Sequence, residues 1–328
     1  MKLSVMQSLM STVDQRWHSP LADQFLACWP HDPPGAWLLR ASSNFVFGFK
    51  SSGVPYILRF VHASQRTPAA LQAEVDFLRY LAACGVRANR PVRSSSGEDV
   101  VSLETPIGRC HAVVFEAFTG EQFETGDLDP AHLFAWGKAA GKLHNFCQGY
   151  PGECRPTWQD QLAGITTALP AHDKDARRAL DRLAGELGRL PISTQNFGLI
   201  HFDLEPDNMI WENLSPGIID FDDCARHWFA ADIALALRDL FDDLASQVNL
   251  QDARFVEFIR GYRSVRQISG EDLAHIPLFM RFSNFLKYGE LLSIIDEEAL
   301  PGAPDWVEKL RQKLAGMVTK YRKELVGG

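Results

Sequence analysis

The sequence predicts an α+β fold in which a β-rich N-terminal lobe with one main helix precedes a larger, α-rich C-terminal lobe. Two β-rich runs, NFVFGFK and VPYILRF, are separated only by Ser51-Ser52-Gly53, which is typical of a hairpin. From Pro130 onward most segments instead carry apolar residues at helical spacing. The 328 residues are enough for two lobes with their own cores, and we expect domains at 1–118 and 119–328.

The elements of the N-terminal lobe follow from local patterns. Residues 1 to about 30 are expected to form a helical leader, which the breaker cluster PHDPPG ends at residue 35. After the hairpin, Leu71, Val75 and Leu78 recur on one face of a predicted helix. Two further runs, DVVSLET and CHAVVFEAF, are predicted strands that complete a small sheet.

The C-terminal lobe is predicted to be mainly helical. The expected helices are AHLFAWGKAAGKLHNF, DARRALDRLAGELGRL, ADIALALRDLFDDLA, DARFVEFIRGY and PDWVEKLRQKLAGMVTKYRKEL. They are interrupted by LIHFDLEPDNMIWENLSPGIIDFDD, residues 199–223, where short apolar β runs flank an acidic loop. Buried like charges are costly, so these carboxylates require either solvent or a multivalent cation.

Composition restricts the class of protein. Apolar residues make up 46% and charged residues 23%, as in ordinary soluble proteins. The 33 Lys and Arg against 41 Asp and Glu give a net charge of −8, which disfavours a nucleic-acid or anionic-membrane surface and leaves room for a cationic or metal-bound partner. Six scattered cysteines without a C-x-x-C pair indicate reduced thiols. Without a signal peptide or an apolar run of about 20 residues, the expected location is cytoplasmic.

The acidic segment carries an ordered set of polar residues: His201-x-Asp203, then Asn208, then Ile219-Asp220 after a second apolar run. This order resembles the aminoglycoside phosphotransferase and choline kinase-like family, whose members show H-G-D-x-x-x-x-N followed by I-D-[FWL]-[DE]. The resemblance implies a two-lobed, protein-kinase-like fold and an ATP-dependent kinase. The alternative is that these residues form only caps and solvated loops.

Phosphoryl transfer depends on positioning and charge neutralisation, which these side chains can provide. Mg²⁺ prefers hard oxygen ligands and takes few from the protein, so Asn208 and Asp220 are the expected metal ligands. Asp203 is the expected catalytic base for the attacking hydroxyl. We expect His201 to brace this catalytic loop by a hydrogen bond. The resemblance also implies that Asp232 braces the loop backbone.

The nucleotide-binding residues are expected in the N-terminal lobe. A kinase of this type needs a strand cation for the α- and β-phosphates, and Arg59 stands where the family usually has Lys. Glu74 lies near the apolar face of the following helix and is the expected partner of Arg59. The remaining candidates are Ser43 and Asn44 for phosphate and, by resemblance, the backbone of Glu116 and Phe118 for adenine.

The acceptor is expected to be a small molecule. After Asp220 the chain enters a helix within a few residues, which leaves no room for a peptide-docking segment. Helices between 157 and 190 resemble those that form a small-molecule pocket in the family. Asp222, Asp223, Asp239 and Glu290 would suit an amine.

The predicted function is therefore ATP- and Mg²⁺-dependent phosphorylation of a hydroxyl on an aminoglycoside, choline, homoserine or a related amine or sugar. Two alternatives remain at this point. One is a protein Ser/Thr kinase of the same fold. The other is a non-catalytic nucleotide-binding module. It would be favoured by Arg59 and by the loop at Ser42-Ser43-Asn44, which departs from the G-x-G-x-x-G pattern of a phosphate-covering loop.

Overall fold

The computed structural model describes residues 2–150, 154–241, 248–295 and 303–327. The chain forms two compact units, each assembled from separate stretches of sequence. Unit 1 comprises Met1–Arg79, Asn89–Ala117 and Ser293–Ala315; unit 2 comprises Tyr80–Ala88, Phe118–Leu292 and Gly316–Gly328. The predicted division into domains 1–118 and 119–328 stays a prediction.

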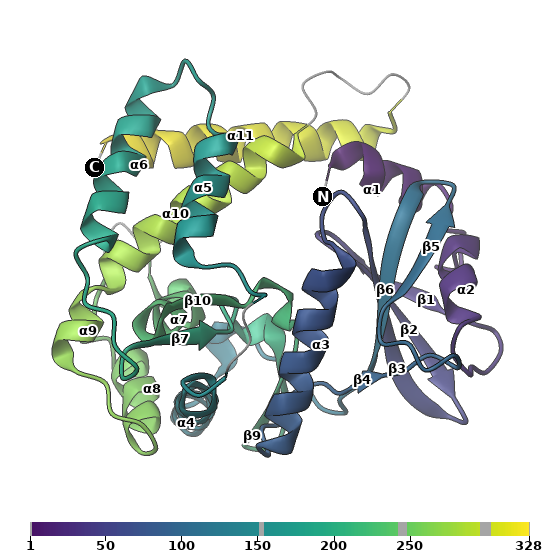
Figure 1. Cartoon of the computed structure of the whole chain (residues 1–328), viewed down its shortest axis with the longest axis horizontal. Helices are drawn as coiled ribbons and strands as arrows, with labels where there is room; N and C mark the ends of the chain where they lie inside the picture. Colours follow the sequence, from purple (N-terminus) through teal and green to yellow (C-terminus); the bar gives the residue numbers. More distant parts are fainter. Residues whose placement is uncertain (1, 151–153, 242–247, 296–302, 328) are drawn as a thin grey trace. The chain divides into compact units, whose positions relative to one another are not determined.

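Unit 1 contains a six-stranded antiparallel sheet with the strand order β1-β2-β3-β6-β4, in which β5 also pairs with β6 (Figure 1). The strands are β1 (Trp37–Ala41), β2 (Phe45–Ser51), β3 (Val54–His62), β4 (Pro91–Val92), β5 (Val101–Thr105) and β6 (Gly108–Glu116). The predicted hairpin is confirmed, because β2 pairs with β3 around a turn in which Ser52 and Gly53 have φ values of 51° and 79°. Neither β1 nor β4 is predicted from the sequence, since both are too short for a clear alternation.

The two faces of β3 have different roles. Leu58 and Phe60 point into an apolar core that also contains Phe47 of β2 and Phe25 of α2. Arg59, between them in the strand, faces the other way because strand side chains alternate. The helices of this unit include α1 (Leu3–Met10) and α2 (Pro20–Leu26), two short helices within the predicted leader, the first part of α3 (Pro68–Ala83), which confirms the predicted main helix, and the first part of α11 (Asp305–Gly327).

Unit 2 is mainly helical, as predicted. Its helices are α4 (Pro130–Cys147), α5 (Trp158–Ala168), α6 (Lys174–Leu187), α7 (Phe229–Ala236), α8 (Ala253–Arg263), α9 (Gly270–Ala274) and parts of α10 (Ile276–Ile294) and α11 (Asp305–Gly327). The predicted helix over 231–245 is wrong in extent: α7 ends at Ala236 and a 3₁₀ turn follows at Arg238–Leu240. Residues 242–245 of that prediction lie outside the described residues. Helix α10 is not predicted, since its buried residues occur on all sides and leave no clear period.

Helices α4 and α8 of unit 2 pack with their backbones in contact. A Cβ atom at Gly137 would lie 1.9 Å from the Phe258 carbonyl oxygen, and one at Gly261 would lie 2.0 Å from the Phe134 carbonyl oxygen. Only glycine permits so close an approach. It brings α8 near enough for its Tyr262 hydroxyl to reach His144 on α4.

Two short antiparallel pairs place the acidic segment in unit 2. Strand β7 (Phe197–Ile200) pairs with β10 (Ala225–Trp228), and β8 (Met209–Glu212) pairs with β9 (Ser215–Ile218). The β runs predicted around the acidic loop are therefore confirmed. Residues 201–208 lead from the first pair to the second, and residues 219–224 lead back. The two predicted site segments are thus neighbouring connections.

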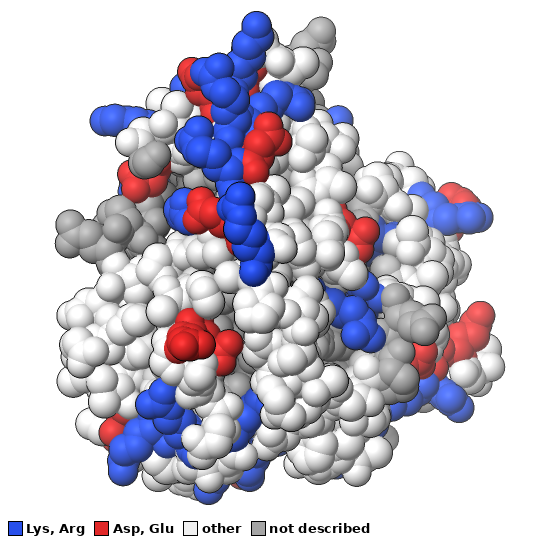
Figure 2. All heavy atoms as spheres, turned by 60° about the vertical axis from the view of Figure 1, so that its left-hand side comes forward, with Lys and Arg blue, Asp and Glu red and all other residues white. Residues whose placement is uncertain are grey.

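Charged side chains of both signs lie on the surface of the protein. On the face shown in Figure 2, Lys and Arg lie among Asp and Glu, with broad uncharged areas between the charged groups. All six cysteines are free thiols, as predicted. In the part of the chain that the structure describes, no helix has the length and apolar character needed to span a membrane.

Candidate active site

His201 joins the two site segments through both of its ring nitrogens. Its Nδ1 accepts a hydrogen bond from the Asp203 backbone N–H at 3.2 Å, so the proton resides on Nε2. That Nε2–H donates to the Ile219 carbonyl oxygen at 2.9 Å. Burial lowers the pKa of His201, which keeps the ring neutral. A neutral, fully hydrogen-bonded imidazole is suited to holding the loop and poorly suited to transferring protons.

Asp203 and Asn208 are in direct contact. The Asn208 Nδ2 group donates to the Asp203 carboxylate Oδ2 and to the Asp203 carbonyl oxygen, both at 2.8 Å. Two acceptors on one side determine the orientation of the amide, so Oδ1 is the atom of Asn208 that remains for a cation. The Asn208 carbonyl oxygen accepts the Ile219 N–H at 3.0 Å. Through Ile219, Asn208 is linked to the residue that precedes Asp220.

Asp220 has an unusual backbone conformation. With φ 61° and ψ 62° it lies in the left-handed region, which costs a non-glycine residue on the order of 1–3 kcal/mol. A 3₁₀ turn over Phe221–Asp223 follows it, and the buried Phe221 ring packs on His201 with ring centroids 4.4 Å apart. The strained conformation persists because its neighbours on both sides are held.

The surroundings of Asp203 favour its protonated form more than water does. Burial and then the nearby carboxylates of Glu205 and Asp223 raise the pKa of Asp203 to about 7, although the hydrogen bond from Asn208 opposes the shift. Glu205 is itself partly buried, which raises its pKa, and forms an ion pair with Arg238 at 3.1 Å. A carboxylate with a raised pKa accepts a proton more readily than an ordinary Asp, which suits a general base.

Asp232 holds the backbone of the catalytic loop, as the resemblance implied. Its Oδ1 accepts the Phe202 N–H at 2.7 Å, and its Oδ2 accepts the His201 N–H at 3.0 Å. The same Oδ2 also contacts His144 Nε2 at 2.9 Å, and His144 Nδ1 contacts the Tyr262 hydroxyl at 2.9 Å. Burial lowers the pKa of His144, so the neutral ring donates to Asp232 and accepts from Tyr262. His144 is therefore a packed, hydrogen-bonded core residue.

The donor set around Asn208 and Asp220 fits a hard divalent cation. It offers one amide oxygen and one carboxylate, and Mg²⁺ usually takes only one or two protein ligands and completes its shell with phosphate and water. Within the described ranges, no three His, Cys, Asp or Glu side chains are grouped so that they could hold a metal ion. This argues against a closed structural zinc site among those residues.

In unit 1, Arg59 and Glu74 form the ion pair that the sequence predicts. The Arg59 Nη2 lies 2.5 Å from Glu74 Oε2, and both side chains are almost completely buried. The Arg59 guanidinium also lies over the Phe115 ring, 5.1 Å from its centroid. The guanidinium is thus held between a strand and α3 in a defined place.

The other predicted nucleotide-binding residues lie in the turn between β1 and β2, at the end of β6 and just after β6. Ser43 and Asn44 form the turn between β1 and β2, with Ser43 exposed and Asn44 buried. Glu116 ends β6, and its N–H donates to the Arg90 carbonyl oxygen at 2.9 Å, so that N–H is already used. The Phe118 ring packs on Gly217, where a Cβ would lie 2.9 Å from the ring. Their roles stay predictions.

The acidic residues proposed for an amine differ in exposure. Asp222 is buried and Asp223 is exposed in the turn after Asp220. Asp239 is exposed and accepts a 3.3 Å hydrogen bond from Thr125, whereas Glu290 pairs with Lys287 at 3.5 Å. Two of the four acids already have identified partners, so their role toward an acceptor stays a prediction.

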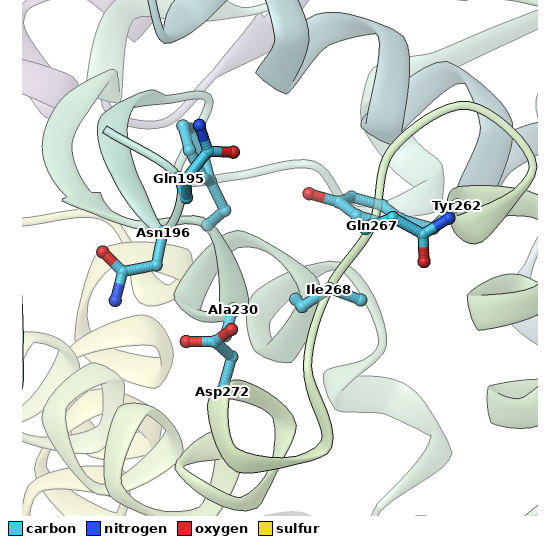
Figure 3. Close-up of a pocket in the computed structure, with 8 residues that line it drawn as sticks. Gln195, Asn196, Ala230, Tyr262, Gln267, Ile268 and Asp272 are labelled. Atoms are coloured by element: carbon cyan, nitrogen blue, oxygen red, sulfur yellow. The ribbon is translucent and has the colours of Figure 1, made fainter. Parts of the chain in front are cut away.

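A small, shallow hollow, open to solvent, lies elsewhere in unit 2 (Figure 3). Its lining includes Gln195, Asn196, Tyr262 and Asp272 and none of the predicted site residues. Asp272 is also engaged, because it caps α9 with Ser269. This hollow is therefore separate from the candidate active site.

Two charged residues near Asp203 are missed by the sequence-based reasoning. Glu205 lies inside the predicted loop, and its place two residues after Asp203 was the available signal. Arg238 had no such signal, because it lies inside the predicted helix ADIALALRDLFDDLA, at a distance from Asp203 in the sequence. In the structure it lies on a 3₁₀ turn and neutralises Glu205.

The chain is similar in sequence to known phosphotransferases. Residues 39–268 match the sequence profile of the phosphotransferase enzyme family, APH. Amicoumacin kinase of Bacillus subtilis (strain 168) is 26% identical over 303 residues, which cover 88% of this chain and 86% of that protein. Homoserine kinase of Rhizobium etli (strain CFN 42) is 35% identical over 253 residues, 74% of each protein.

Solved structures give the same result. The amicoumacin kinase hAmiN, in complex with AMP-PNP, Ca²⁺ and Ami, superposes with a TM-score of 0.79 at 25% identity and covers 98% of this chain and 96% of its own. The microcompartment-associated aminopropanol kinase has a TM-score of 0.65 at 22% identity, with 93% of this chain and 97% of its own covered. The second likeness, at that identity, concerns the fold alone.

Proposed function

The chain belongs to the phosphotransferase enzyme family, and we propose that it transfers the γ-phosphate of ATP, with Mg²⁺, to a hydroxyl of an amine-bearing small molecule. Membership makes it a small-molecule kinase with the α+β, protein-kinase-like fold that the sequence predicts. The proposal adds the nucleotide, the metal and the class of acceptor. A cytoplasmic location, where ATP is available, is part of it.

One observation carries the proposal: the 2.8 Å hydrogen bond between Asn208 Nδ2 and the Asp203 carboxylate. It joins the proposed base to a proposed metal ligand, and it leaves the second Asp203 oxygen to receive a proton. Because phosphoryl transfer is catalysed mainly by positioning and charge neutralisation, such a rigid link is what the reaction requires.

The proposed steps assign one task to each residue. Asp203 accepts the proton of the acceptor hydroxyl as that oxygen bonds to the γ-phosphorus and the bond to the β,γ-bridging oxygen breaks, which releases ADP. His201 and Asp232 hold the loop that carries Asp203. Asn208 and Asp220 would hold Mg²⁺, which, when bound, neutralises phosphate charge. Arg59, held by Glu74, would contact the α- and β-phosphates.

The remaining nucleotide contacts are proposed from the resemblance and from exposure. Ser43, in an exposed turn, and Asn44 beside it are candidates for phosphate. Since the Glu116 N–H is already bonded, its carbonyl and the Phe118 N–H are the candidate groups for adenine. Arg59 in place of Lys keeps the charge and adds a planar set of donors.

The acceptor is proposed to carry an amine as well as a hydroxyl. Homoserine kinase of Rhizobium etli, at 35% identity, is named for a substrate that carries both an amine and a hydroxyl. In this chain, Asp223 and Asp222 would face the amine. Aminoglycosides, choline and related amines or sugars belong to the same class of candidates.

The test is a coupled ADP-release assay with Mg²⁺-ATP and a panel of amino alcohols, aminoglycosides and sugars. We expect one class of amine to stimulate ADP release. Asp203→Asn should reduce turnover by at least about 10²-fold while nucleotide binding persists, because only the base is lost. Asp207→Asn is the matched control, since Asp207 is an exposed acid in the same loop.

Three results would contradict the proposal. Near-normal turnover of the Asp203 variant would exclude that residue as the base. Labelled phosphate on proteins of a lysate, with none on small molecules, would indicate a protein kinase. Mg²⁺-ATP binding without turnover of any acceptor or of water would favour the non-catalytic module.

A further inference from the structure

Arg155, which precedes α5, reaches into the turn that follows Asp220. Its guanidinium donates to three backbone carbonyl oxygens: those of Phe221 at 3.0 Å, Asp222 at 2.6 Å and Cys224 at 3.0 Å. The side chain is buried, with 6% of the residue exposed. Burying a guanidinium carries a large desolvation cost, and three hydrogen bonds from this one go to carbonyls of a single turn, which indicates that the conformation of this turn matters.

The backbone of the turn departs from ideal geometry at two points. Its internal backbone hydrogen bond, from the Cys224 N–H to the Phe221 carbonyl oxygen, is long at 3.4 Å. The residue at its start, Asp220, is in the strained left-handed conformation. The segment that carries Arg155 also bonds to β10, just after the turn. There the Arg226 N–H donates to the Pro156 carbonyl oxygen at 2.8 Å.

Asp220 therefore lies between two restrained neighbours. On its N-terminal side, Ile219 is bonded through its N–H to Asn208 and through its carbonyl oxygen to His201. On its C-terminal side, the carbonyls of the turn are bonded to Arg155. Removing the guanidinium releases the second restraint, whereas the hydrogen bonds among Asp203, Asn208 and His201 do not involve it.

We infer that Arg155 is a positioning residue that fixes the Asp220 carboxylate for a divalent cation bound with the nucleotide. The inference rests on the proposed function, in which Asp220 is a metal ligand. It adds a residue that lies outside the catalytic sequence motif, 65 positions before Asp220. Groups that orient a metal ligand typically change metal affinity about 10–100-fold when they are removed, and we expect a change of that size.

The structure offers a matched control in Arg177 of α6. Its guanidinium likewise donates to three backbone carbonyl oxygens, those of Thr166 at 3.3 Å, Leu169 at 2.5 Å and Pro170 at 3.1 Å. These belong to the end of α5 and the connection after it, among the helices expected to form the acceptor pocket and outside the segments that carry Asp203, Asn208 and Asp220. Arg177→Ala thus removes the same chemistry without releasing the Asp220 turn.

The experiment measures binding of Mn²⁺ to the full-length protein in the presence of ADP, by the loss of the free Mn²⁺ electron paramagnetic resonance signal, beside thermal unfolding. We expect both Arg155→Ala and Arg177→Ala to lower the melting temperature. Only Arg155→Ala should weaken Mn²⁺ binding, by at least about 10-fold. Ethylguanidine added to Arg155→Ala should restore much of the affinity.

The outcomes separate this inference from the proposed function. If the wild-type protein binds Mn²⁺–ADP and Arg155→Ala binds it equally well, the inference is overturned and the proposed function stands. If the wild-type protein itself shows no metal-dependent nucleotide binding, both are overturned. Should Arg155→Ala fail to fold, Arg155→Lys decides: it keeps the charge but loses the planar donors, and unchanged Mn²⁺ affinity would overturn the inference.

Discussion

Asp232 in unit 2 and Glu74 in unit 1 are both buried carboxylates, with 0% and 1% of the residue exposed, yet their hydrogen bonding differs. Asp232 has partners on both oxygens: two backbone N–H groups and the imidazole of His144. Glu74 pairs with Arg59 through Oε2, whereas its Oε1 is buried without a hydrogen-bond partner.

We interpret this difference as one between a carboxylate that stabilises the fold and an ion pair that positions a side chain for ligand binding. A carboxylate with every acceptor used rigidifies its surroundings, and its partners here are the fixed backbone of the catalytic loop. A buried ion pair with an unsatisfied oxygen contributes little to the free energy of unfolding, because apolar residues of similar size would stabilise the fold as well or better. We therefore interpret the Arg59–Glu74 pair as holding a guanidinium for phosphate.

The largest effect should come from Asp232→Ala. It leaves the N–H groups of His201 and Phe202 and the His144 imidazole without their acceptor, so we expect a loss of about 5 kcal/mol in the free energy of unfolding. Urea unfolding at pH 7.5 measures it. Asp232→Asn, which retains one acceptor oxygen, should lose less. Equal stability of Asp232→Ala and the wild type would contradict the role of Asp232 as a brace.

A smaller loss is expected from Glu74→Ala. It removes one hydrogen bond and one already unsatisfied oxygen, so we expect a loss of about 3 kcal/mol, together with weaker Mg²⁺-ATP binding because Arg59 is no longer held. Urea unfolding and calorimetric titration measure the two effects. Arg59→Lys is the control that keeps the charge, and it should retain substantial activity. If Glu74→Ala lost more stability than Asp232→Ala, the comparison would be reversed.

The smallest effect, and one of opposite sign, should come from His227→Phe. The His227 ring is fully buried among aromatic rings, including Phe279 and Phe282, and both of its nitrogens lack a hydrogen-bond partner. Replacing it by an apolar ring removes the unsatisfied groups, so we expect a gain of about 1 kcal/mol at pH 7.5.

The pH dependence of His227→Phe provides a second measurement. Burial lowers the pKa of His227 to about 3, so the native ring stays neutral while the unfolded ring takes up a proton below its ordinary pKa of about 6.5. Wild-type stability is therefore lost as the pH falls from about 6.5 toward 3. Urea unfolding at several pH values should show a slope shallower by up to about 1.4 kcal/mol per pH unit in the variant, and an unchanged slope would show that His227 titrates normally.

Much of the fold could be predicted where local patterns agree with the final packing. The β2–β3 hairpin follows from two β-rich runs around Ser52-Gly53, and α3 follows from its single apolar face. The same reasoning failed for residues 231–245, because a helical period does not show that packing ends α7 at Ala236. It also missed α10, whose burial on all sides removes the period on which prediction depends.

The candidate site divides in the same way. His201, Asp203, Asn208 and Asp220 could be recognised because they lie within 20 residues in an order that the chemistry requires. Arg155 could not, since it contacts the Asp220 turn from a distant part of the chain and a lone arginine carries no pattern. Tyr262 likewise reaches His144 only because Gly137 and Gly261 let two helices approach closely.

By itself, the sequence determined many of the elements, the α+β class, the family and the short motif that carries the proposed chemistry, because each depends on residues close together in the chain. Only the tertiary structure decided which carboxylate is fully hydrogen-bonded, which group of the Asn208 amide bonds to Asp203 and which arginine bonds to the turn after Asp220. The physical reason is that hydrogen-bond satisfaction depends on partners far apart in the chain, such as His144 and Tyr262, 118 residues apart, which come together only when the helices pack.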